Sequence, residues 1–310
     1  MASISRSISS SNFRRNFSKH KALYWMALPG MLWYIIFRYV PLGGSIIAFQ
    51  NYNIFNGIFK SEFIGFAHFL HFFRFPEFWQ ILNNNLLLGL YDLVIAFPIP
   101  IVLALMLNEL TGKYFKRFTQ TMVYIPHFLS WIIIGGIFIA ILSPNDGVVA
   151  YFMRLFGLKP IYFMADPRYI RGIIIGAGIW RDAGWGMIVY LAAIAGINPS
   201  LYEAAEMDGA GKFRQVLSIT LPSIFPIILV MLLLKIGHFL DFGFERVYAL
   251  MNPMNQQKAD IFDTYVYRAG LMQMQYAYAT AVGLFKSVIG FGLLLISNTV
   301  SKKLTGSGII

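Results

Sequence analysis

The feature that most constrains this chain is a series of long apolar runs. A helix needs roughly 20 mostly apolar residues to cross the hydrocarbon core of a bilayer. We find six such runs, near residues 22–48, 81–107, 119–142, 172–196, 223–242 and 279–300. In lipid every backbone polar group must be satisfied within the chain, so separate runs of this length favour helices. The sequence predicts an all-α membrane protein with six transmembrane helices.

Composition agrees with this class and narrows the chemistry. The chain is 57% hydrophobic and 13% charged, whereas soluble domains carry about 25% charged residues. Cysteine is absent, which excludes disulfides and thiolate metal sites. The histidines do not follow metal-ligand spacing and are His20, His68, His71, His127 and His238. We predict no metal site, and no nucleic-acid partner, because the net charge of +11 is scattered among the apolar runs.

The distribution of Lys and Arg predicts the orientation. With a cytosolic N-terminus, the short inner segments hold twelve of these residues and the much longer outer segments nine. This density favours both termini in the cytosol. The first apolar run is too long for a signal peptide and lacks a cleavage site, so we interpret it as an uncleaved span. We predict a basic cytosolic tail at 1–21, a membrane domain at 22–301 and a cytosolic tail at 302–310, in the cytoplasmic membrane.

Prolines occur inside the first two runs. They are Pro29, Pro41, Pro98 and Pro100. Each removes a backbone donor, so we expect local kinks whose freed carbonyls are satisfied by neighbouring helices.

The connection between the fourth and fifth runs, residues 197–222, carries the most informative pattern. It reads Glu203-Ala204-Ala205, three residues, Gly209, nine residues, Ile219, one residue, Leu221-Pro222. Ser200 and Glu203 have the spacing of a capping box, which predicts a short helix. Gly209 and Gly211 permit a sharp bend after it. Pro222 suits the first turn of the fifth span.

This pattern resembles the EAA loop of ATP-binding-cassette importer permeases in the maltose-permease superfamily, at every position given above. Six spans agree with the core of that family. Three N-terminal segments look like its complex-oligosaccharide branch: Arg38-Tyr39-Val40-Pro41, Ala48-Phe49-Gln50-Asn51-Tyr52 and Phe63-Ile64-Gly65. The resemblance covers nearly the whole chain and implies the importer permease fold with a cytosolic coupling helix.

The resemblance also implies partners. In that family the loop docks in a cleft of an ATPase subunit, so Glu203 is the expected anchor, Ala204 and Ala205 the docking face, and Gly209 the hinge. A second homologous permease, two ATPase subunits, an extracytoplasmic solute-binding protein and a carbohydrate, an oligosaccharide, are implied, with membrane lipid around the spans. The chain has no Gly-x-x-x-x-Gly-Lys-Ser/Thr pattern, the phosphate-binding loop of many ATPases. ATP and Mg²⁺ are therefore expected on the partners, and this chain is expected to have no cofactor and no enzymatic activity.

Polar residues inside apolar runs are costly and mark functional or interhelical contacts. The pathway candidates, which offer hydrogen bonds and aromatic faces to a sugar, are Tyr91, Asp92, Trp180, Arg181, Asp182, Trp185, Lys235 and His238. Arg181 and Asp182 point about 100° apart on a helix, so we expect that they do not neutralise each other and that they face different partners or a wet cavity. Lys235 and His238 share one face. For the charged residues, including Lys286 in the sixth run, the alternative interpretation is interhelical pairing, for example of Asp182 with Lys235. For Trp180 and Trp185 the alternative is ordinary packing.

Two other classes remain as alternatives. A secondary transporter driven by protons or sodium could use Asp92, Asp182 and His238 as a relay, but such carriers favour inverted repeats and do not require the 203–222 spacing. A membrane enzyme acting on lipid-linked sugars would need an acidic pair or a histidine cluster at the membrane surface, and we find neither in the sequence.

The predicted orientation is testable by cysteine accessibility. Cysteines introduced at Ser10 and Ser218 should resist membrane-impermeant thiol reagents in intact cells, whereas one at Ser61 should react. Labelling at Ser218 would contradict a cytosolic coupling loop.

Overall fold

The computed structural model describes residues 20–305. Nearly all of the regular structure is helical. The chain divides into two compact units, Met1–Phe66 and Ala67–Ile310. The predicted basic tail up to residue 19, and residues 306–310 of the predicted C-terminal tail, lie outside the described residues.

The first unit contains a helical run followed by a small hairpin. The run consists of α2 (Lys21–Tyr34), the π-helical segment η1 (Ile35–Tyr39), α3 (Val40–Gly44) and the 3-10 segment η2 (Ser45–Phe49). It is 29 residues long, which agrees with the span predicted at 22–48. The strands β1 (Gln50–Asn51) and β2 (Glu62–Phe63) are antiparallel, with Gln50 opposite Phe63. The helix α4 (Gly57–Lys60) lies between them in sequence.

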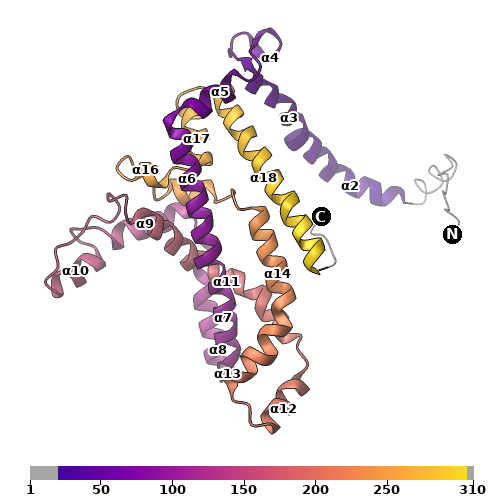
Figure 1. Ribbon diagram of the computed structural model, residues 1–310, viewed down its shortest axis with the longest axis vertical. Coiled ribbons are helices and arrows are strands. Elements are labelled where there is room, and N and C mark those ends of the chain that lie inside the picture. The colour runs from indigo at the N-terminus through magenta and orange to yellow at the C-terminus, as the bar shows by residue number, and fades with distance from the viewer. Residues whose placement is uncertain (1–19, 306–310) are drawn as a thin grey trace. The chain divides into compact units, whose positions relative to one another are not determined.

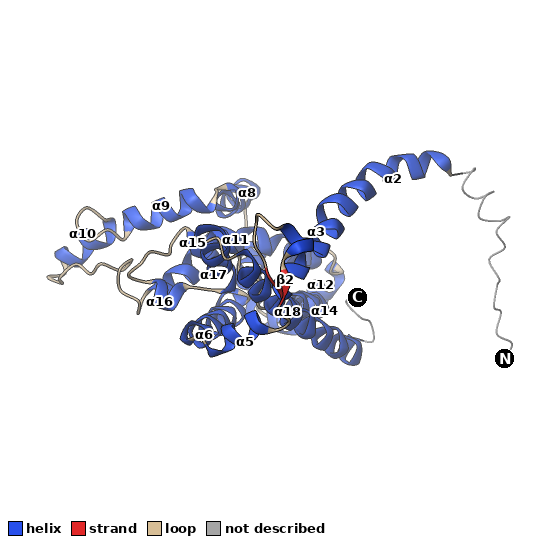
Figure 2. Cartoon of the chain, turned by 90° about the horizontal axis from the view of Figure 1, so that it is seen from above, coloured by secondary structure: helices blue, strands red, loops and turns tan. Residues whose placement is uncertain are grey.

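The second unit alternates long and short helices. Its first half contains α5 (Ala67–Arg74), α6 (Pro76–Tyr91), η3 (Asp92–Ala96), α7 (Pro98–Glu109), α8 (Lys113–Tyr124), η4 (Ile125–Phe128), α9 (Trp131–Ile141) and α10 (Val148–Leu155). Its second half contains α11 (Ile170–Ala195), α12 (Pro199–Met207), α13 (Lys212–Gln215), η5 (Val216–Thr220), α14 (Leu221–Gly237), α15 (Phe244–Tyr248), α16 (Gln256–Ala259), α17 (Phe262–Tyr267), η6 (Arg268–Met272) and α18 (Tyr276–Thr305). Within this unit α14 lies beside α18, and α9 with α10 extends away from the other long helices (Figures 1 and 2).

Four helical runs are long and apolar enough to cross a membrane singly, and bent pairs bring the number to as many as six. Besides the run in the first unit, the single runs are Pro76–Glu109, Lys212–Gly237 and Tyr276–Lys303. The second and sixth predicted spans are therefore confirmed. The fifth was placed too late: its helix begins at Lys212 and ends at Gly237 instead of covering 223–242. Polar residues before Pro222 lower the local hydropathy, so the apolar run in the sequence starts later than the helix does.

The third predicted span, 119–142, is not one straight helix. Lys113–Phe128 and Trp131–Ile141 meet at 104°. Pro126 lies in the 3-10 turn η4, and the hydroxyl of Ser130 accepts a hydrogen bond from the backbone N–H of Ile133, which starts α9 anew. The fourth predicted span, 172–196, corresponds to α11. At 26 residues, α11 is about 39 Å long and can cross the hydrocarbon core alone.

Three of the four π-helical segments in the described residues end two positions before a proline. These prolines are Pro41 after η1, Pro98 after η3 and Pro222 after η5. Proline lacks an N–H and collides with the carbonyl four residues earlier, and that carbonyl lies inside the π segment each time. A π turn shifts the hydrogen bond to the fifth residue. The distortion predicted at Pro41 and Pro98 therefore takes the form of a widened turn, whereas Pro29 and Pro100 lie within α2 and α7.

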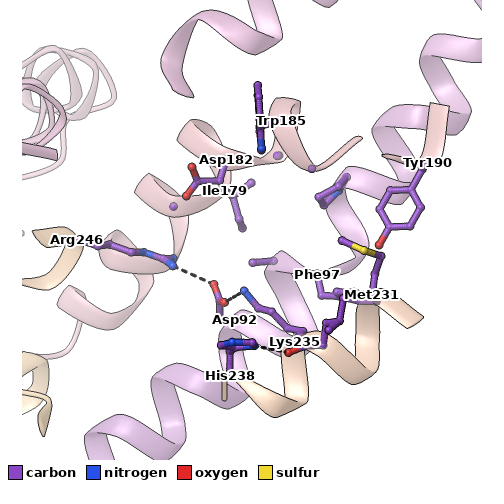
Figure 3. Close-up of a pocket in the computed structure, with 16 residues that line it drawn as sticks. Asp92, Phe97, Ile179, Asp182, Trp185, Tyr190, Met231, Lys235, His238 and Arg246 are labelled. Atoms are coloured by element: carbon purple, nitrogen blue, oxygen red, sulfur yellow. Dashed lines mark hydrogen bonds and ion pairs between the residues drawn. The ribbon is translucent and has the colours of Figure 1, made fainter. Parts of the chain in front are cut away.

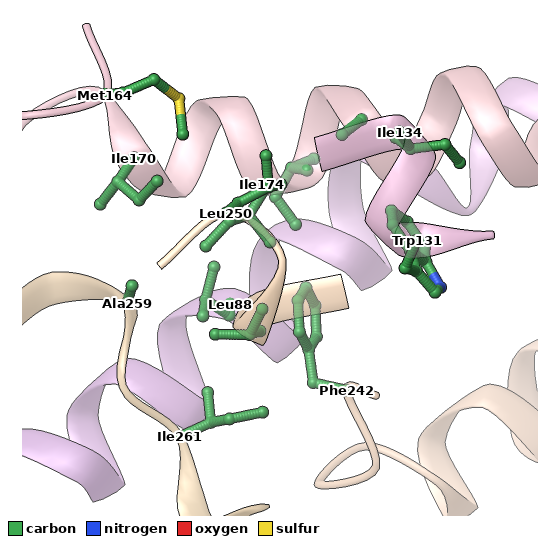
Figure 4. Close-up of a cluster of buried hydrophobic side chains, with 13 residues drawn as sticks. Leu88, Trp131, Ile134, Met164, Ile170, Ile174, Phe242, Leu250, Ala259 and Ile261 are labelled. Atoms are coloured by element: carbon green, nitrogen blue, oxygen red, sulfur yellow. The ribbon is translucent and has the colours of Figure 1, made fainter. Parts of the chain in front are cut away.

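The apolar core of the second unit is built around α11. One cluster packs α11 against α6, α9 and the chain after α14, and includes Leu88, Trp131, Ile134, Ile174, Phe242 and Leu250 (Figure 4). A second packs the later part of α11 on α7 and α14, through Ala104, Leu107, Met187, Tyr190, Ile194 and Ile224. A third, around Phe72, joins α5, α6, α17 and α18. Since α11 takes part in two of the three clusters, it positions the other helices.

The approach of α8 to α11 depends on Gly184. A Cβ built at Gly184 would overlap the backbone carbonyl of Val123, whereas one built at Gly176, on the same helix, meets nothing within 4 Å. We expect Gly184→Ala to destabilise the fold by about 1–3 kcal/mol, because a backbone atom cannot move aside as a side chain does. Gly176→Ala should not destabilise it. The thermal midpoints of the full-length variants in detergent measure this, and equal midpoints would contradict the packing described.

Candidate functional site

A cavity of about 400 Å³ lies between α11, α14 and the junction of η3 with α7. Its volume falls within the ~300–1,000 Å³ typical of ligand sites. Apolar side chains form most of the wall. The polar and aromatic groups on it are Asp92, Phe97, Asp182, Trp185, Tyr190, Lys235, His238 and Arg246 (Figure 3).

Asp92 is the central charge of this cavity. Its side chain is 9% exposed and forms ion pairs with both Lys235 and Arg246. Arg246 Nη1 lies 3.1 Å from one carboxylate oxygen, and the Lys235 ammonium contacts the other. Figure 3 shows the carboxylate between the two cations. A carboxylate buried in a membrane helix needs such partners, because desolvation disfavours its charge.

Arg246 is held in place on several sides. Its Nε donates to the carbonyl oxygen of Ile174 at 3.1 Å, and its guanidinium carbon lies 4.3 Å from the ring centre of Phe242. A Cβ at Gly178 would overlap the guanidinium, so glycine there makes room for it. With its side chain 8% exposed, Arg246 is a fixed structural charge. Lys235, at 43%, reaches the cavity.

A second charged group surrounds Asp182. Its Oδ1 accepts a hydrogen bond from Arg181 Nη1 at 2.9 Å and lies 3.0 Å from His127 Nδ1. The imidazole of His127 stacks on Trp185, with ring centres 4.6 Å apart. The expectation that Arg181 and Asp182 do not neutralise each other was wrong, because the long arginine side chain reaches back to its neighbour. The suggested pairing of Asp182 with Lys235 was also wrong, since Lys235 pairs with Asp92.

The structure brings together five of the eight pathway candidates at the cavity: Asp92, Asp182, Trp185, Lys235 and His238. Arg181 is not on the wall, but it holds Asp182 and the carbonyl oxygen of Leu129. Trp180 makes an edge contact with Phe138. Tyr91 packs against the core cluster around Leu88. These three residues do not line the cavity.

Sequence reasoning missed three polar contributors to the site: Tyr190 in the fourth run, Arg246 and His127. Arg246 stands beyond the fifth apolar run and was assigned to an outer loop, and His127 follows a proline in the third run. An aspartate inside the second run signalled that a cation partner must exist, since isolated intramembrane charges are costly. No local pattern named Arg246, because it lies 154 positions away. Lys286, another intramembrane charge, instead bridges Asp241 and Asp263.

The second candidate site is the short helix α12 in the 197–222 connection. Its N-cap is Asn198, whose side-chain oxygen accepts a hydrogen bond from the backbone N–H of Ser200 at 3.1 Å. The predicted Ser200–Glu203 capping box was therefore wrong. Pro199 occupies the first helical position, so the cap lies two residues earlier than the sequence spacing indicated. Glu203 and Ala204 are exposed, and Ala205 is half-buried.

The turn after α12 is tightly built. Gly209 has φ +75°, and the N–H of Ala210 donates to the carbonyl of Ala205 at 2.8 Å. This is a left-handed helix end, which favours glycine. Gly211 has φ −67° and needs no such freedom. Lys212 pairs with Glu206 at 2.9 Å, and the hydroxyls of Tyr202 and Thr220 lie 2.8 Å apart, so α12 is braced against η5.

Residues 96–306 match the family described as the binding-protein-dependent transport system inner membrane component. This match includes α12 and most of the cavity wall. Because it covers more than half of the sequence, the chain belongs to this family of multi-pass inner-membrane transport proteins.

Relatives and solved structures extend over nearly the whole length. The polygalacturonan/rhamnogalacturonan transport system permease protein YteP of Bacillus subtilis (strain 168) is 47% identical over 291 residues, 94% of this chain and 91% of the relative. Protein LplB of the same organism is 45% identical over 94% of this chain and 92% of LplB. A subunit of a bacterial alginate ABC transporter, crystallised with an alginate-bound periplasmic protein, matches with a TM-score of 0.88 and 40% identity, covering 95% and 99% of the two chains.

The family assignment decides between the classes considered from sequence. The chain is a permease subunit of an ABC importer rather than an enzyme or a proton-driven carrier. The importer permease fold inferred from the EAA pattern is confirmed. The site residues themselves remain predictions.

The two cations of Asp92 should differ in their effect on folding. Arg246→Met removes a buried partner with several contacts and should cost about 3–5 kcal/mol. Lys235→Met leaves Asp92 paired with Arg246, so the protein should fold and assemble but transport poorly. Recovery of monodisperse full-length protein after detergent extraction measures the first effect, and uptake measures the second. Normal recovery of Arg246→Met would refute its structural role.

Proposed function

We propose that this chain forms half of the translocation path of an ATP-driven oligosaccharide importer. A solute-binding protein would deliver the sugar from outside, a second homologous permease would complete the path, and two ATPase subunits would bind and hydrolyse ATP with Mg²⁺. Both termini and α12 would face the cytosol, in agreement with the Lys and Arg density of the inner segments.

A carbohydrate substrate agrees with the chemistry of the cavity. Trp185 and Tyr190 offer aromatic surface, and Asp182, Lys235 and His238 offer charged or polar groups to hydroxyls. Relatives point the same way: the names of YteP and of the alginate transporter subunit refer to polysaccharides. We assign the cavity to the sugar path, with Arg181, Trp180 and Tyr91 supporting its walls.

The observation that carries the proposal is the position of α12 in the chain. It connects α11 directly to the run from α13 through η5 to α14, and α11 and α14 are the two helices on facing sides of the cavity (Figure 3). A partner that binds α12 can therefore displace both α11 and α14, and with them two walls of the cavity. Because α12 is short, a few exposed residues should dominate its docking energy. We assign the contact to Glu203, Ala204 and Ala205, and the turn to Gly209.

Two substitutions test the coupling role. Gly209→Val places a β-branched side chain at a positive φ, at a cost of about 1–2 kcal/mol, and Glu203→Lys reverses an exposed charge. Both variants should insert normally, because neither position lies in an apolar run. Both should lose substrate-stimulated ATP hydrolysis and sugar uptake together in the reconstituted complex.

Gly211→Val is the matched control. It makes the same change two residues further on, where φ is −67° and a Cβ meets nothing within 4 Å, so coupling should survive. Full coupling in the Glu203→Lys, Gly209→Val double variant would reject the proposal. Recovery of a P-loop ATPase with the affinity-purified chain gives an independent check.

A further inference from the structure

The cavity carries more positive than negative charge. Its permanent cations are Lys235 and Arg246 on the wall and Arg181 behind it, and its carboxylates are Asp92 and Asp182. Two histidines, His127 and His238, add positive charge whenever they are protonated. Asp241 and Asp263 lie off the wall, where both contact Lys286. Three cations therefore surround a cavity that holds two carboxylates.

The spare charge can be assigned to one side chain. Arg246 is buried and already satisfies Asp92, while Arg181 satisfies Asp182. Lys235 shares Asp92 with Arg246 but is 43% exposed. An ammonium group has three donors, and one carboxylate oxygen uses only one of them. Lys235 can therefore contact Asp92 and still present donors to a molecule in the cavity.

A positive charge in excess of the carboxylates around it is costly inside a membrane bundle unless an anion approaches it. An anionic group on the substrate would satisfy this cation at the moment of passage. Carboxylates make strong charge-assisted hydrogen bonds with ammonium groups, and aromatic faces such as Trp185 suit the apolar side of a sugar ring. Lys235 and Trp185 lie on different helices, α14 and α11, with the cavity between them (Figure 3).

We propose that the cavity selects saccharides that carry carboxylate groups, and that Lys235 is the residue that contacts the carboxylate. This inference rests on the proposed function and specifies the chemical class of its substrate. Arg246 acts as a positioning residue. By holding Asp92, it allows the Lys235 ammonium to turn toward the substrate without leaving the aspartate unpaired.

The test compares an oligogalacturonate with its methyl ester, which keeps the same sugar backbone and length but removes the charge. Uptake of each is measured in proteoliposomes containing the complete complex and the binding protein, with loading of the binding protein measured separately. The readout is the ratio of acid to ester uptake in each variant relative to the parent, which cancels the binding protein's own preference. Lys235→Gln should lower this ratio about tenfold, the effect of losing one charge-assisted hydrogen bond.

Two further variants separate the charge from the fold. Lys235→Arg keeps the positive charge and should preserve most of the ratio. Lys302→Gln makes the same change as Lys235→Gln at an exposed position in the last turn of α18 and should leave the ratio unaltered. If Lys235→Gln leaves the ratio unchanged, including by lowering both uptakes equally, the proposal is overturned.

Transport by the parent complex distinguishes failure of the carboxylate inference from failure of the proposed importer function. Transport of the ester but not of the acid would overturn the carboxylate inference while the importer function stands. Failure to transport any saccharide, with no stimulation of ATP hydrolysis, would overturn both. Transport of the acid, with its loss in Lys235→Gln and its return in Lys235→Arg, supports the assignment.

Discussion

The second unit depends on the satisfaction of one buried carboxylate. Asp92 interrupts an apolar helix, and its two cations come from α14 and α15. Arg246 in turn donates to the carbonyl oxygen of Ile174 on α11. One ion-pair group therefore joins four segments, η3, α11, α14 and α15, which come from three distant parts of the sequence. In a membrane the hydrophobic effect gives little drive for helices to associate, so polar contacts of this kind have a large share in setting their arrangement.

Prolines shape the same helices without breaking them. The segments η3 and η5 widen the backbone before Pro98 and Pro222. The helices α7 and α14, which line the cavity, begin at these points. A widened turn keeps the apolar helix continuous while it changes which residues face inward. Asp92 is the first residue of η3, so the proline-induced turn lies directly beside the central charge.

The sequence was informative where the physics is local. Hydropathy over about 20 residues identified the long helices, and the 203–222 spacing identified the family. Sequence reasoning failed where residues far apart in the sequence are in contact. Arg246 lies 154 positions from Asp92, and no periodicity connects them. The prediction that Arg181 and Asp182 do not pair considered only the directions in which their Cβ atoms leave the helix. The arginine side chain is long enough to bend back to its neighbour. The cap of α12 was misplaced by two residues because Pro199 fixes where the helix starts.

In the proposed function, the stretch from α11 to α14 supplies both the docking helix α12 and two walls of the path. The connection between α11 and α14 is short, ordered by the hydrogen bond between Tyr202 and Thr220 and by the Glu206–Lys212 pair. A rigid connection transmits displacement, whereas a flexible one would absorb it. Its one residue with a required left-handed backbone is Gly209 among positions 197–222. A movement imposed on α12 therefore reaches α11 and α14 together, and with them Asp182 on one wall and Lys235 on the other.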